Sequence, residues 1–385
     1  MSKTNMLFTI VIFLIILSIL VIAHEIGHFA AAKYFGVQVE EFGLGFPPRA
    51  AQIHQSKDGV KWTLNWLPLG GFVKLKGEDG QSKQDPDSFS HKKPWKRIVI
   101  LSAGVFMNVV LAFVLLSIGF SVGWPQDLTE KSVPDKFIKE KNIMIAYIEP
   151  ASPADKADIK TGDIIKNIDN QPFAGLADMQ NFIKDKENQK VSIEIDRTGE
   201  IFKKEITPQK IEFNIDSDGK KTIEKIGIGV GLAEVGVVRY PVHQAVYLGA
   251  KNTVIYMARI FQAFYNLIKD LILTRKISPN IGGPVMIAAL SGRAAQLGFI
   301  YIIQFIALLS LNLAIINILP LPALDGGRIL FAIVEKFKGR AVSVNLESWI
   351  HMIGFWLIIL LMILVTARDI ARFQIWDKVK NIIAS

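Results

Sequence analysis

The chain of 385 residues contains no cysteine. This absence excludes disulfide bonds, thiolate metal ligands and cysteine nucleophiles, although it does not identify the compartment. Charged residues make up only 21% of the chain, and only six residues are histidines, so a histidine-based site must draw on very few positions. The net charge of +9 is spread along the chain without an arginine-rich arm. That distribution favours attraction to a membrane surface over nucleic-acid binding.

Hydrophobic residues are abundant, at 50% of the chain, and the mean hydropathy is +0.33. Long apolar runs at residues 6–35, 98–124, 300–319 and 349–367 can each cross a hydrocarbon core of about 30 Å. The first run is too long for a signal-peptide core and is preceded by a single basic residue, Lys3, so we expect it to be retained. The sequence therefore predicts a polytopic α-helical membrane protein with about four transmembrane helices.

A metal-binding pattern, His24-Glu25-Ile26-Gly27-His28, lies inside the first apolar run. An ionised carboxylate in the middle of a transmembrane helix costs about 2.5 to 3.5 kcal/mol, so such a residue normally faces a cavity, a partner or a metal. Positions i and i+4 share one helix face, which lets both imidazoles bind one Zn²⁺ while the glutamate activates a water. A chance match would more readily occur on a solvated helix, where it costs nothing.

Two histidines leave the zinc site incomplete, since a hydrolytic zinc normally takes three protein ligands and a water. The best third ligand is Asp325, which follows the third apolar run directly. Pro320 and Pro322 end the helix there, while Gly326 and Gly327 let the backbone bend around a ligand. An ordinary turn aspartate is the alternative. We expect one zinc ion per chain, held by His24, His28 and Asp325.

The remaining histidines compete poorly as ligands. His54, His91 and His243 lie in polar segments. His351 lies near the start of the last apolar run, where packing or interfacial solvation is the expected role.

Two segments with alternating polarity, residues 60–66 and 72–76, flank the turn Pro68-Leu69-Gly70-Gly71. The pattern predicts a membrane-associated or re-entrant β-hairpin. Non-helical backbone at membrane depth needs protein or water to satisfy it, and an exposed strand edge could pair with a substrate peptide. An ordinary surface hairpin is the alternative.

Basic residues indicate the sidedness of the spans. Residues 33–97 contain eleven lysines and arginines, which places this loop on the cytoplasmic side. The amino terminus, the long segment after the second span and the carboxyl terminus are then extracytoplasmic. A basic tail with Arg368, Arg372, Lys378 and Lys380 disagrees with that last assignment.

Residues 142–231 read as a small α+β domain, with strands at 143–148, 191–196 and 202–207, another ending at Ile168, and a helix at 176–184. The run E-P-A-S-P-A-D-K-A-D-I-K-T-G-D-I-I-K-N-I-D resembles the core of a PDZ domain, a fold that captures peptides by edge addition. No G-L-G-F-type loop occurs between Asn142 and Pro150, so carboxylate capture does not follow.

The predicted organisation has four parts. Residues 1–124 hold the first two spans, the H-E-x-x-H motif and the hairpin, and residues 125–241 hold the extracytoplasmic PDZ-like domain. Residues 242–299 form an amphipathic segment that is either an interfacial helix or a fifth span. Residues 300–385 hold the last two spans with the proline-rich motif that ends in Asp325, Gly326 and Gly327.

These motifs together resemble the site-2 proteases, and specifically the bacterial RseP-like intramembrane zinc metalloproteases. The matching segments are H-E-I-G-H, L-G-G-F-V-K-L, S-A-G-V-F-M-N, G-G-P and N-I-L-P-L-P-A-L-D-G-G. The resemblance implies that His24, His28 and Asp325 bind zinc and that Glu25 is the catalytic base. It also implies substrate contacts for Asn317 and for the hairpin residues Gly70, Gly71, Phe72, Val73 and Lys74, while Asn108 either supports the site or packs helices.

The resemblance predicts hydrolysis of peptide bonds inside transmembrane segments in the bacterial cytoplasmic (inner) membrane. The partners are then membrane-protein substrates, such as anti-sigma factors or remnant signal peptides, and the lipid bilayer, but not nucleic acid. The alternative is a membrane-bound PDZ scaffold with a vestigial metal site. A zinc transporter is a third option, but transport does not need H-E-x-x-H beside a PDZ-like domain.

Overall fold

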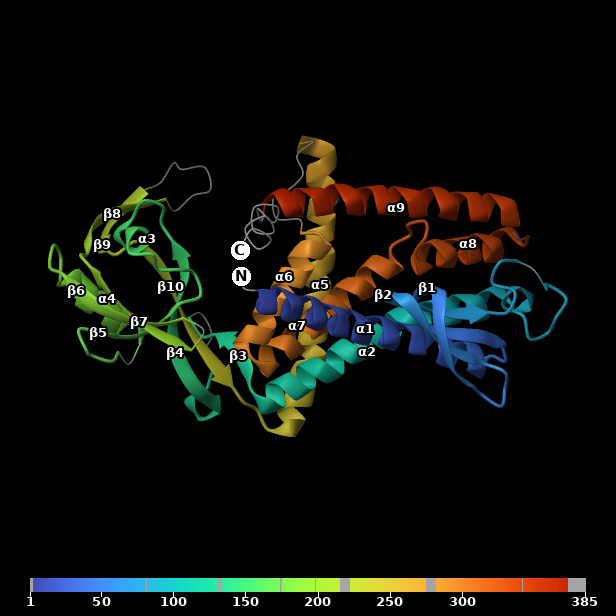
Figure 1. The fold of residues 1–385 in the computed structure, drawn as a ribbon, viewed down its shortest axis with the longest axis horizontal. Coiled ribbons are helices and arrows are strands. Elements are labelled where there is room, and N and C mark those ends of the chain that lie inside the picture. Colours follow the sequence, from blue (N-terminus) through green and yellow to red (C-terminus); the bar gives the residue numbers. More distant parts are fainter. Residues whose placement is uncertain are drawn as a thin grey trace. The chain divides into compact units, whose positions relative to one another are not determined.

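The computed structural model describes residues 3–80, 82–129, 133–173, 175–197, 199–214, 222–274, 282–340 and 342–372. The chain divides into two compact units (Figure 1). Unit 1 consists of residues 1–118 and 245–385, and unit 2 of residues 119–244. Lys378 and Lys380, in the basic tail whose side of the membrane was in conflict, lie outside the described residues.

Four helices are long and apolar enough to cross a membrane, which confirms the four spans predicted from the sequence as helices of that kind. A helix that is apolar all round is expected where lipid or other helices surround it. The four helices are α1 (Lys3–Tyr34), α2 (Pro94–Val122), α7 (Phe299–Ile318) and α9 (Val344–Arg372).

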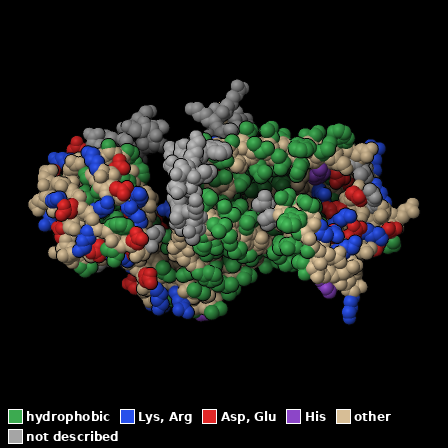
Figure 2. Space-filling model, viewed as in Figure 1, with side chains coloured by type: hydrophobic (Ala, Val, Ile, Leu, Met, Phe, Trp, Pro, Cys, Tyr) green, Lys and Arg blue, Asp and Glu red, His purple; other side chains and the backbone are tan. Residues whose placement is uncertain are grey.

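The surface of unit 1 fits a membrane location. Figure 2 shows hydrophobic side chains gathered over its helices, while charged side chains gather around the β1–β2 sheet and the neighbouring loops. Along α9, large apolar side chains such as Trp356 and Leu357 are more than half exposed. In water, an apolar surface of this extent would be an interaction site or an aggregation hazard, whereas lipid tails cover it without cost.

Helix α5 (Val242–Thr274) differs from these four, because it does not have their uninterrupted apolar composition. In Figure 1 it runs steeply across α1, α2 and α9. It passes so close to α2 that a Cβ added at Gly249 would lie 2.9 Å from the backbone nitrogen of Ser117. A side chain at that position would therefore separate the two helices.

Two shorter helices complete the helical part of unit 1. Helix α6 (Pro284–Leu297) packs on α1 and α9, and helix α8 (Asp325–Lys338) follows α7. The carboxylate of Asp369, near the end of α9, accepts hydrogen bonds from the backbone N–H groups of Gly283 (2.9 Å) and Met286 (3.0 Å). This buried side chain thereby satisfies free N–H groups at the start of α6 and ties α9 to it.

The chain between α1 and α2 forms a small sheet of β1 (Val39–Gln55) and β2 (Lys61–Leu75), followed by a short 3₁₀ helix, η1 (Phe89–His91). The predicted pairing of residues 60–66 with 72–76 is wrong. Strand β2 continues through residues 68–71, and residues 41–44 of β1 lie between its two halves, paired with both. Pro47 and Pro48 interrupt the pattern of β1, and prolines are depleted in strands, so the sequence did not reveal this strand.

Unit 2 is built on a six-stranded sheet with the strand order β3-β10-β4-β5-β6-β7, beside a hairpin of β8 and β9. The structure confirms the predicted strands at residues 143–148, 164–168, 191–196 and 202–207 and the helix at 176–184. The elements are β3 (Trp124–Asp127), η2 (Asp135–Phe137), β4 (Ile138–Ile148), α3 (Pro153–Lys156), β5 (Ile164–Ile168), α4 (Leu176–Lys184), β6 (Val191–Arg197), β7 (Glu200–Ile206), β8 (Gln209–Asn214), β9 (Thr222–Gly227) and β10 (Val230–Val238).

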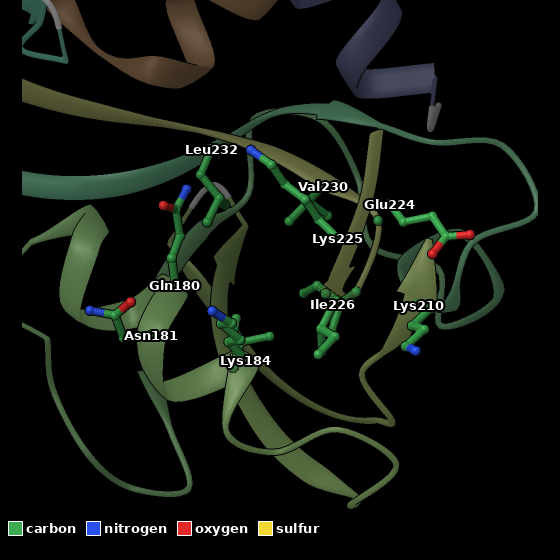
Figure 3. A pocket seen from close by; sticks show the side chains of 13 residues that line it. Gln180, Asn181, Lys184, Lys210, Glu224, Lys225, Ile226, Val230 and Leu232 are labelled. Carbon is green, nitrogen blue, oxygen red and sulfur yellow. The ribbon is translucent and has the colours of Figure 1, made fainter. Parts of the chain in front are cut away.

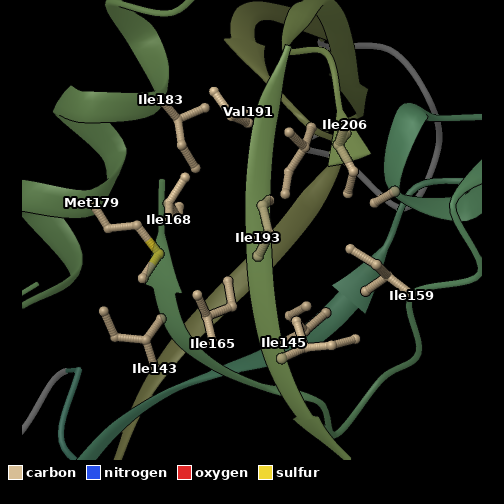
Figure 4. Close-up of a cluster of buried hydrophobic side chains, with 13 residues drawn as sticks. Ile143, Ile145, Ile159, Ile165, Ile168, Met179, Ile183, Val191, Ile193 and Ile206 are labelled. Atoms are coloured by element: carbon tan, nitrogen blue, oxygen red, sulfur yellow. The ribbon is translucent and has the colours of Figure 1, made fainter. Parts of the chain in front are cut away.

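The core of unit 2 is rich in isoleucine, as Figure 4 shows. Strand β6 contributes alternate residues, because period-2 alternation sends every second side chain to the same face. Val191, Ile193 and Ile195 of this strand are almost completely buried, and Met179 and Ile183 of α4 cover them. Helix α4 is thereby fixed on one face of the sheet.

A buried ion pair joins two segments of unit 2. The carboxylate of Asp163 is 1% exposed and accepts hydrogen bonds from Nε (2.7 Å) and Nη2 (2.8 Å) of Arg197. These hydrogen bonds raise the pKa of the Arg197 guanidinium, and burial opposes the shift. The geometry is bidentate, which is the strongest arrangement for such a pair.

Candidate metal centre

The two histidines of the H-E-x-x-H motif lie on one face of α1, as the i, i+4 spacing predicts. His24 is 7% exposed and His28 is 9% exposed. Their rings meet edge to face, with centroids 4.7 Å apart, and their Nε2 atoms are 3.1 Å apart. Both imidazoles therefore direct the same nitrogen toward one point.

The other ring nitrogen of each histidine contacts α2. The Nδ1–H of His28 donates to the backbone carbonyl of Ile100 at 2.9 Å. This bond leaves Nε2 of His28 unprotonated and able to bind a metal. Nδ1 of His24 lies 3.3 Å from the side-chain amide of Asn108.

Asp325 brings a third ligand atom to the same point from α8. Its Oδ2 lies 3.0 Å from Nε2 of His24 and 3.3 Å from Nε2 of His28. The three ligand atoms all lie within 4.8 Å of one another. Asp325 is the first residue of α8, and a chain reversal at residues 319–324 carries it back toward α1.

This arrangement fits a zinc ion. Oδ2 of Asp325 is buried and has no hydrogen-bond partner in the described part of the chain. Two imidazole nitrogens and a carboxylate oxygen that converge in this way repel each other unless protons or a cation lie between them. Two histidines and one carboxylate form a common protein ligand set of catalytic zinc sites, which keep a fourth position for water.

Two glycines allow α1 and α2 to approach closely beside the histidines. A Cβ at Gly27 would lie 2.6 Å from the carbonyl carbon of Ala103, and a Cβ at Gly104 would lie 2.8 Å from Cε1 of His24. Neither position has room for a side chain. Neither glycine is recognisable as a site residue from the sequence, because the sequence of one helix does not show how closely the next helix approaches it.

Asn108 is fully buried and lies against His24, a position that fits support of the site; direct contact with substrate stays a prediction. Its amide nitrogen faces Nδ1 of His24, while its Oδ1 has no partner among the described atoms. A side-chain amide can occupy the same space in two orientations that exchange its oxygen and nitrogen. The reverse orientation lets Oδ1 accept the Nδ1–H of His24, which satisfies both groups and leaves Nε2 of His24 free for the metal.

Strand β2 passes beside Glu25. A Cβ added at Gly71 would lie 3.7 Å from Cγ of Glu25 and 3.1 Å from the side chain of Val21. Since residues 71–75 pair with β1 on one side only, their other edge has no strand partner among the described residues. The backbone of this edge is therefore available near Glu25.

The other predicted hairpin residues are placed differently. Phe72 packs its ring against Gly43, and Val73 packs against a core cluster that includes Phe42 and Leu75. Lys74 forms an ion pair with Glu40 at 2.8 Å and is largely exposed. Gly70 lies against the ring of Phe46.

Asn317, in the last turn of α7, directs its amide nitrogen toward the metal centre. The Nδ2 atom lies 3.5 Å from Nε2 of His24, and the side chain is half-buried. A donor in this position can reach a ligand bound at the open side of the centre. Five residues from four helices thus meet here: His24 and His28 with Asn108, Asn317 and Asp325.

His351, for which packing or interfacial solvation was predicted, also makes a hydrogen bond close to the metal centre. Its Nδ1 accepts the backbone N–H of Ala323 at 2.9 Å, two residues before Asp325. No motif or spacing in the sequence links His351 to Asp325, because the contact depends on how α9 packs against the preceding loop.

Unit 2 has a groove of about 500 Å³ between α4 and the segment that leads into β10 (Figure 3). Glycines at positions 227 and 229 lie on its rim, in the run Ile226-Gly227-Ile228-Gly229-Val230. Residues 230–233 of β10 pair with β4 on one side, while β3 pairs with β10 only from Val235 onward. A glycine-rich loop and an open strand edge therefore meet in this groove, far along the chain from residues 142–150, where the sequence has no G-L-G-F-type loop.

Comparison with known proteins connects these features to a family. The model of peptidase family M50 matches residues 12–361. Proteins whose names carry the words zinc metalloprotease are similar over almost their full length. One from Rhizobium meliloti is 30% identical and covers 95% of this chain and 97% of that protein, and one from Rickettsia conorii is 31% identical and covers 94% and 98%.

A solved structure, the PDZ domain of an SdrC-like protein from Listeria monocytogenes, matches 25% of this chain and 90% of that domain at 21% identity. Its TM-score is 0.20, which is too low to carry an argument about the fold of unit 2.

Proposed function

The chain belongs to peptidase family M50, and we propose that its activity as an intramembrane zinc metalloprotease depends on one zinc ion held by His24, His28 and Asp325. The observation that carries this proposal is the convergence of three ligand atoms from α1 and α8, beside a glutamate, within an apolar helical unit. A non-proteolytic scaffold is not favoured by this family membership.

When bound, zinc supplies Lewis-acid chemistry: it lowers the pKa of a water and polarises a carbonyl. Glu25 accepts the proton of the attacking water as general base and then delivers it to the leaving amine. The amide of Asn317 donates to the oxygen of the scissile carbonyl, where negative charge develops. Asn108 holds the ring of His24, and the carbonyl of Ile100 holds that of His28.

The substrate must reach this centre as an extended strand, because a helix hides its carbonyls in i to i+4 hydrogen bonds. The free edge at residues 71–75 supplies backbone donors and acceptors beside Glu25. Pairing with this edge offsets part of the cost of unwinding a transmembrane helix, where unsatisfied polar groups are expensive. The side chains at the edge have a minor role in this proposal, since recognition is through the backbone.

We infer that unit 2 is a PDZ-like domain on the extracytoplasmic side and that it limits access of bulky substrates. The groove between α4 and β10 supports this assignment, since an extended peptide could pair with residues 230–233. Deletion of residues 142–231 should increase cleavage of a substrate that retains its full ectodomain. Cleavage of a substrate already trimmed to its membrane segment should not change. Equal rates for the full-length substrate with and without the deletion would remove the gate from this proposal.

We also infer that α5 lies in the plane of the membrane rather than crossing it. A helix that runs steeply across α1, α2 and α9 cannot share their direction through the bilayer. Apolar side chains such as Tyr247, Val254 and Phe261 are exposed along it, while Lys251 and Arg259 interrupt the apolar run. This pattern is typical of interfacial helices.

The direct test uses Glu25→Gln in liposomes with a single-span model substrate. Glutamine keeps the shape of the side chain but is not a base, so cleavage should fall by about 10²-fold or more. Zinc content should stay at one ion per chain, since Glu25 is not a ligand here. The control is Ile26→Ala, a lipid-exposed change next to Glu25, which should leave both quantities unchanged. Wild-type cleavage by the Glu25→Gln protein would disprove the mechanism.

A further inference from the structure

The turn that carries Asp325 adopts an unusual backbone conformation. Ala323 has φ = 70°, in the left-handed region that side chains other than glycine rarely adopt. The turn is also tightly packed. A Cβ at Gly327 would lie 3.1 Å from the carbonyl carbon of Leu321, so the start of α8 folds directly onto the turn. Such a conformation persists only where the surroundings hold it.

Helix α9 supplies that support through one face. His351 accepts the N–H of Ala323 at Nδ1, and Gly354, one turn later, lies against Pro322. A Cβ at Gly354 would lie 3.0 Å from the carbonyl carbon of Pro322. Residues at i and i+3 share a helix face, so α9 contacts the turn at two consecutive points.

The imidazole of His351 is itself held in place. Its ring contacts that of Phe331 in α8, with centroids 5.6 Å apart. Because Nδ1 accepts a hydrogen bond from a backbone N–H, the ring proton of the neutral form is on Nε2. His351 borders a polar cavity of about 470 Å³, whose lining also includes Arg97, Arg328 and Glu347. Nε2 itself is buried and has no hydrogen-bond partner among the described atoms, so Nδ1 makes the only side-chain hydrogen bond that the described residues give this imidazole.

We propose that His351 is a positioning residue for the metal centre. By accepting the N–H of Ala323, it holds the left-handed turn that places Oδ2 of Asp325 between the two imidazoles. His351 touches neither the metal ligands nor the space where substrate would bind, so it acts only through the turn. The inference rests on the proposed function to the extent that Asp325 is the third zinc ligand.

The test compares two replacements of His351 in the full-length protein. His351→Ala removes the acceptor, whereas His351→Asn keeps an oxygen close to the position of Nδ1. Zinc retention is measured by equilibrating each protein with a graded series of zinc–chelator buffers. Loss of an outer partner of a metal ligand typically weakens metal binding 10- to 100-fold, so His351→Ala should fall in that range. His351→Asn should stay within about threefold of wild type by the same reasoning.

A second change tests whether the effect passes through the turn. Glycine adopts positive φ without the steric penalty of alanine. Ala323→Gly in the His351→Ala background should therefore recover part of the lost zinc affinity. Activity should follow, with a lower kcat and little change in KM for His351→Ala, because the substrate strand edge is untouched. Ile353→Ala, at an exposed position of the same helix, is the matched control and should behave as wild type.

Three outcomes would overturn the proposal. The first is wild-type zinc retention in His351→Ala, and the second is failure of both His351→Asn and Ala323→Gly to restore it. The third is an equal loss in the Ile353→Ala control, which would mean that α9 acts only as general support. Asp325→Ala separates this inference from the proposed function. If Asp325→Ala loses zinc while His351→Ala keeps it, only the role of His351 is wrong.

Discussion

The close approach of α1 and α2 at the metal centre predicts a large effect of a very small change, Gly104→Ala. The added Cβ would lie 2.7 Å from Cε1 of His28 and nearer still to its Nε2, whereas ordinary contact begins at 3.4 Å. The ring of His28 would have to move by about 1.0 Å to bring Nε2 to a contact of 3.4 Å from the added Cβ. Metal–ligand distances tolerate only about ±0.2 Å, so His28 could not keep its place in the site.

Weakening of one ligand should lower zinc affinity at least as much as loss of an outer partner, that is about 100-fold, or about 2.7 kcal/mol. The same substitution should favour the helix itself by about 1 kcal/mol, because alanine is a better helix former than glycine. Gly104→Ala is thus expected to lose zinc without losing helix. Gly27→Ala should be more disruptive, since its Cβ would meet the backbone of Ala103, which cannot rotate away.

The assay is zinc content in buffered chelator, together with far-ultraviolet circular dichroism of the purified protein. Phe106→Ala is the control, because Phe106 lies two residues away on the same helix and is 66% exposed. It should bind zinc as wild type does. If Gly104→Ala also retained wild-type zinc affinity and activity, the ring of His28 would not be confined between α1 and α2, and the reasoning would be refuted.

Three further predictions follow from the structure. Asn108→Asp should keep zinc affinity near wild type, because it retains an oxygen that accepts the Nδ1–H of His24. Asn108→Ala removes this acceptor and should lower zinc affinity about 10- to 100-fold. Equal losses in the two variants would contradict the reversed amide orientation. Arg197→Ala should destabilise unit 2 by about 3 to 5 kcal/mol, since the buried carboxylate of Asp163 loses its ion-pair partner. An unchanged transition in a thermal melt of the full chain would contradict this prediction. Removal of zinc by a chelator should abolish cleavage, and zinc should restore it; full activity in the metal-free protein would exclude zinc from the reaction.

Much of the metal centre could be predicted from the sequence, because its parts follow local rules. The i, i+4 spacing of His24 and His28 determines that they share a helix face, whatever the helix packs against. Asp325 could be proposed because the site needed a third ligand and the prolines before it end a helix. The four spans were also predictable, since their length and apolar composition reflect the thickness of the bilayer.

The remaining features depend on contacts between segments far apart in the chain. The β1–β2 pairing was predicted wrongly because residues 41–44 lie between two segments that resemble the arms of one hairpin. Position 104 must be glycine because the imidazole rings on α1 leave no room for a side chain there. His351 has a role only because the turn before Asp325 passes close to α9. The hydrophobic periodicity of a segment indicates which of its faces is buried, but it does not identify the segment that packs against that face.

The three candidate ligands are held in different ways, and this difference bears on how the centre responds to its surroundings. His24 and His28 are fixed on a continuous helix, pressed against α2 and bonded through their Nδ1 sides. Asp325 instead depends on a left-handed turn whose support comes from α9, the span with the most exposed apolar surface. A displacement of α9 would therefore reach the metal through Asp325 and leave the histidines in place. The carboxylate is the adjustable ligand of this centre, because its position is determined by a turn and by the contacts of that turn with α9 at His351 and Gly354.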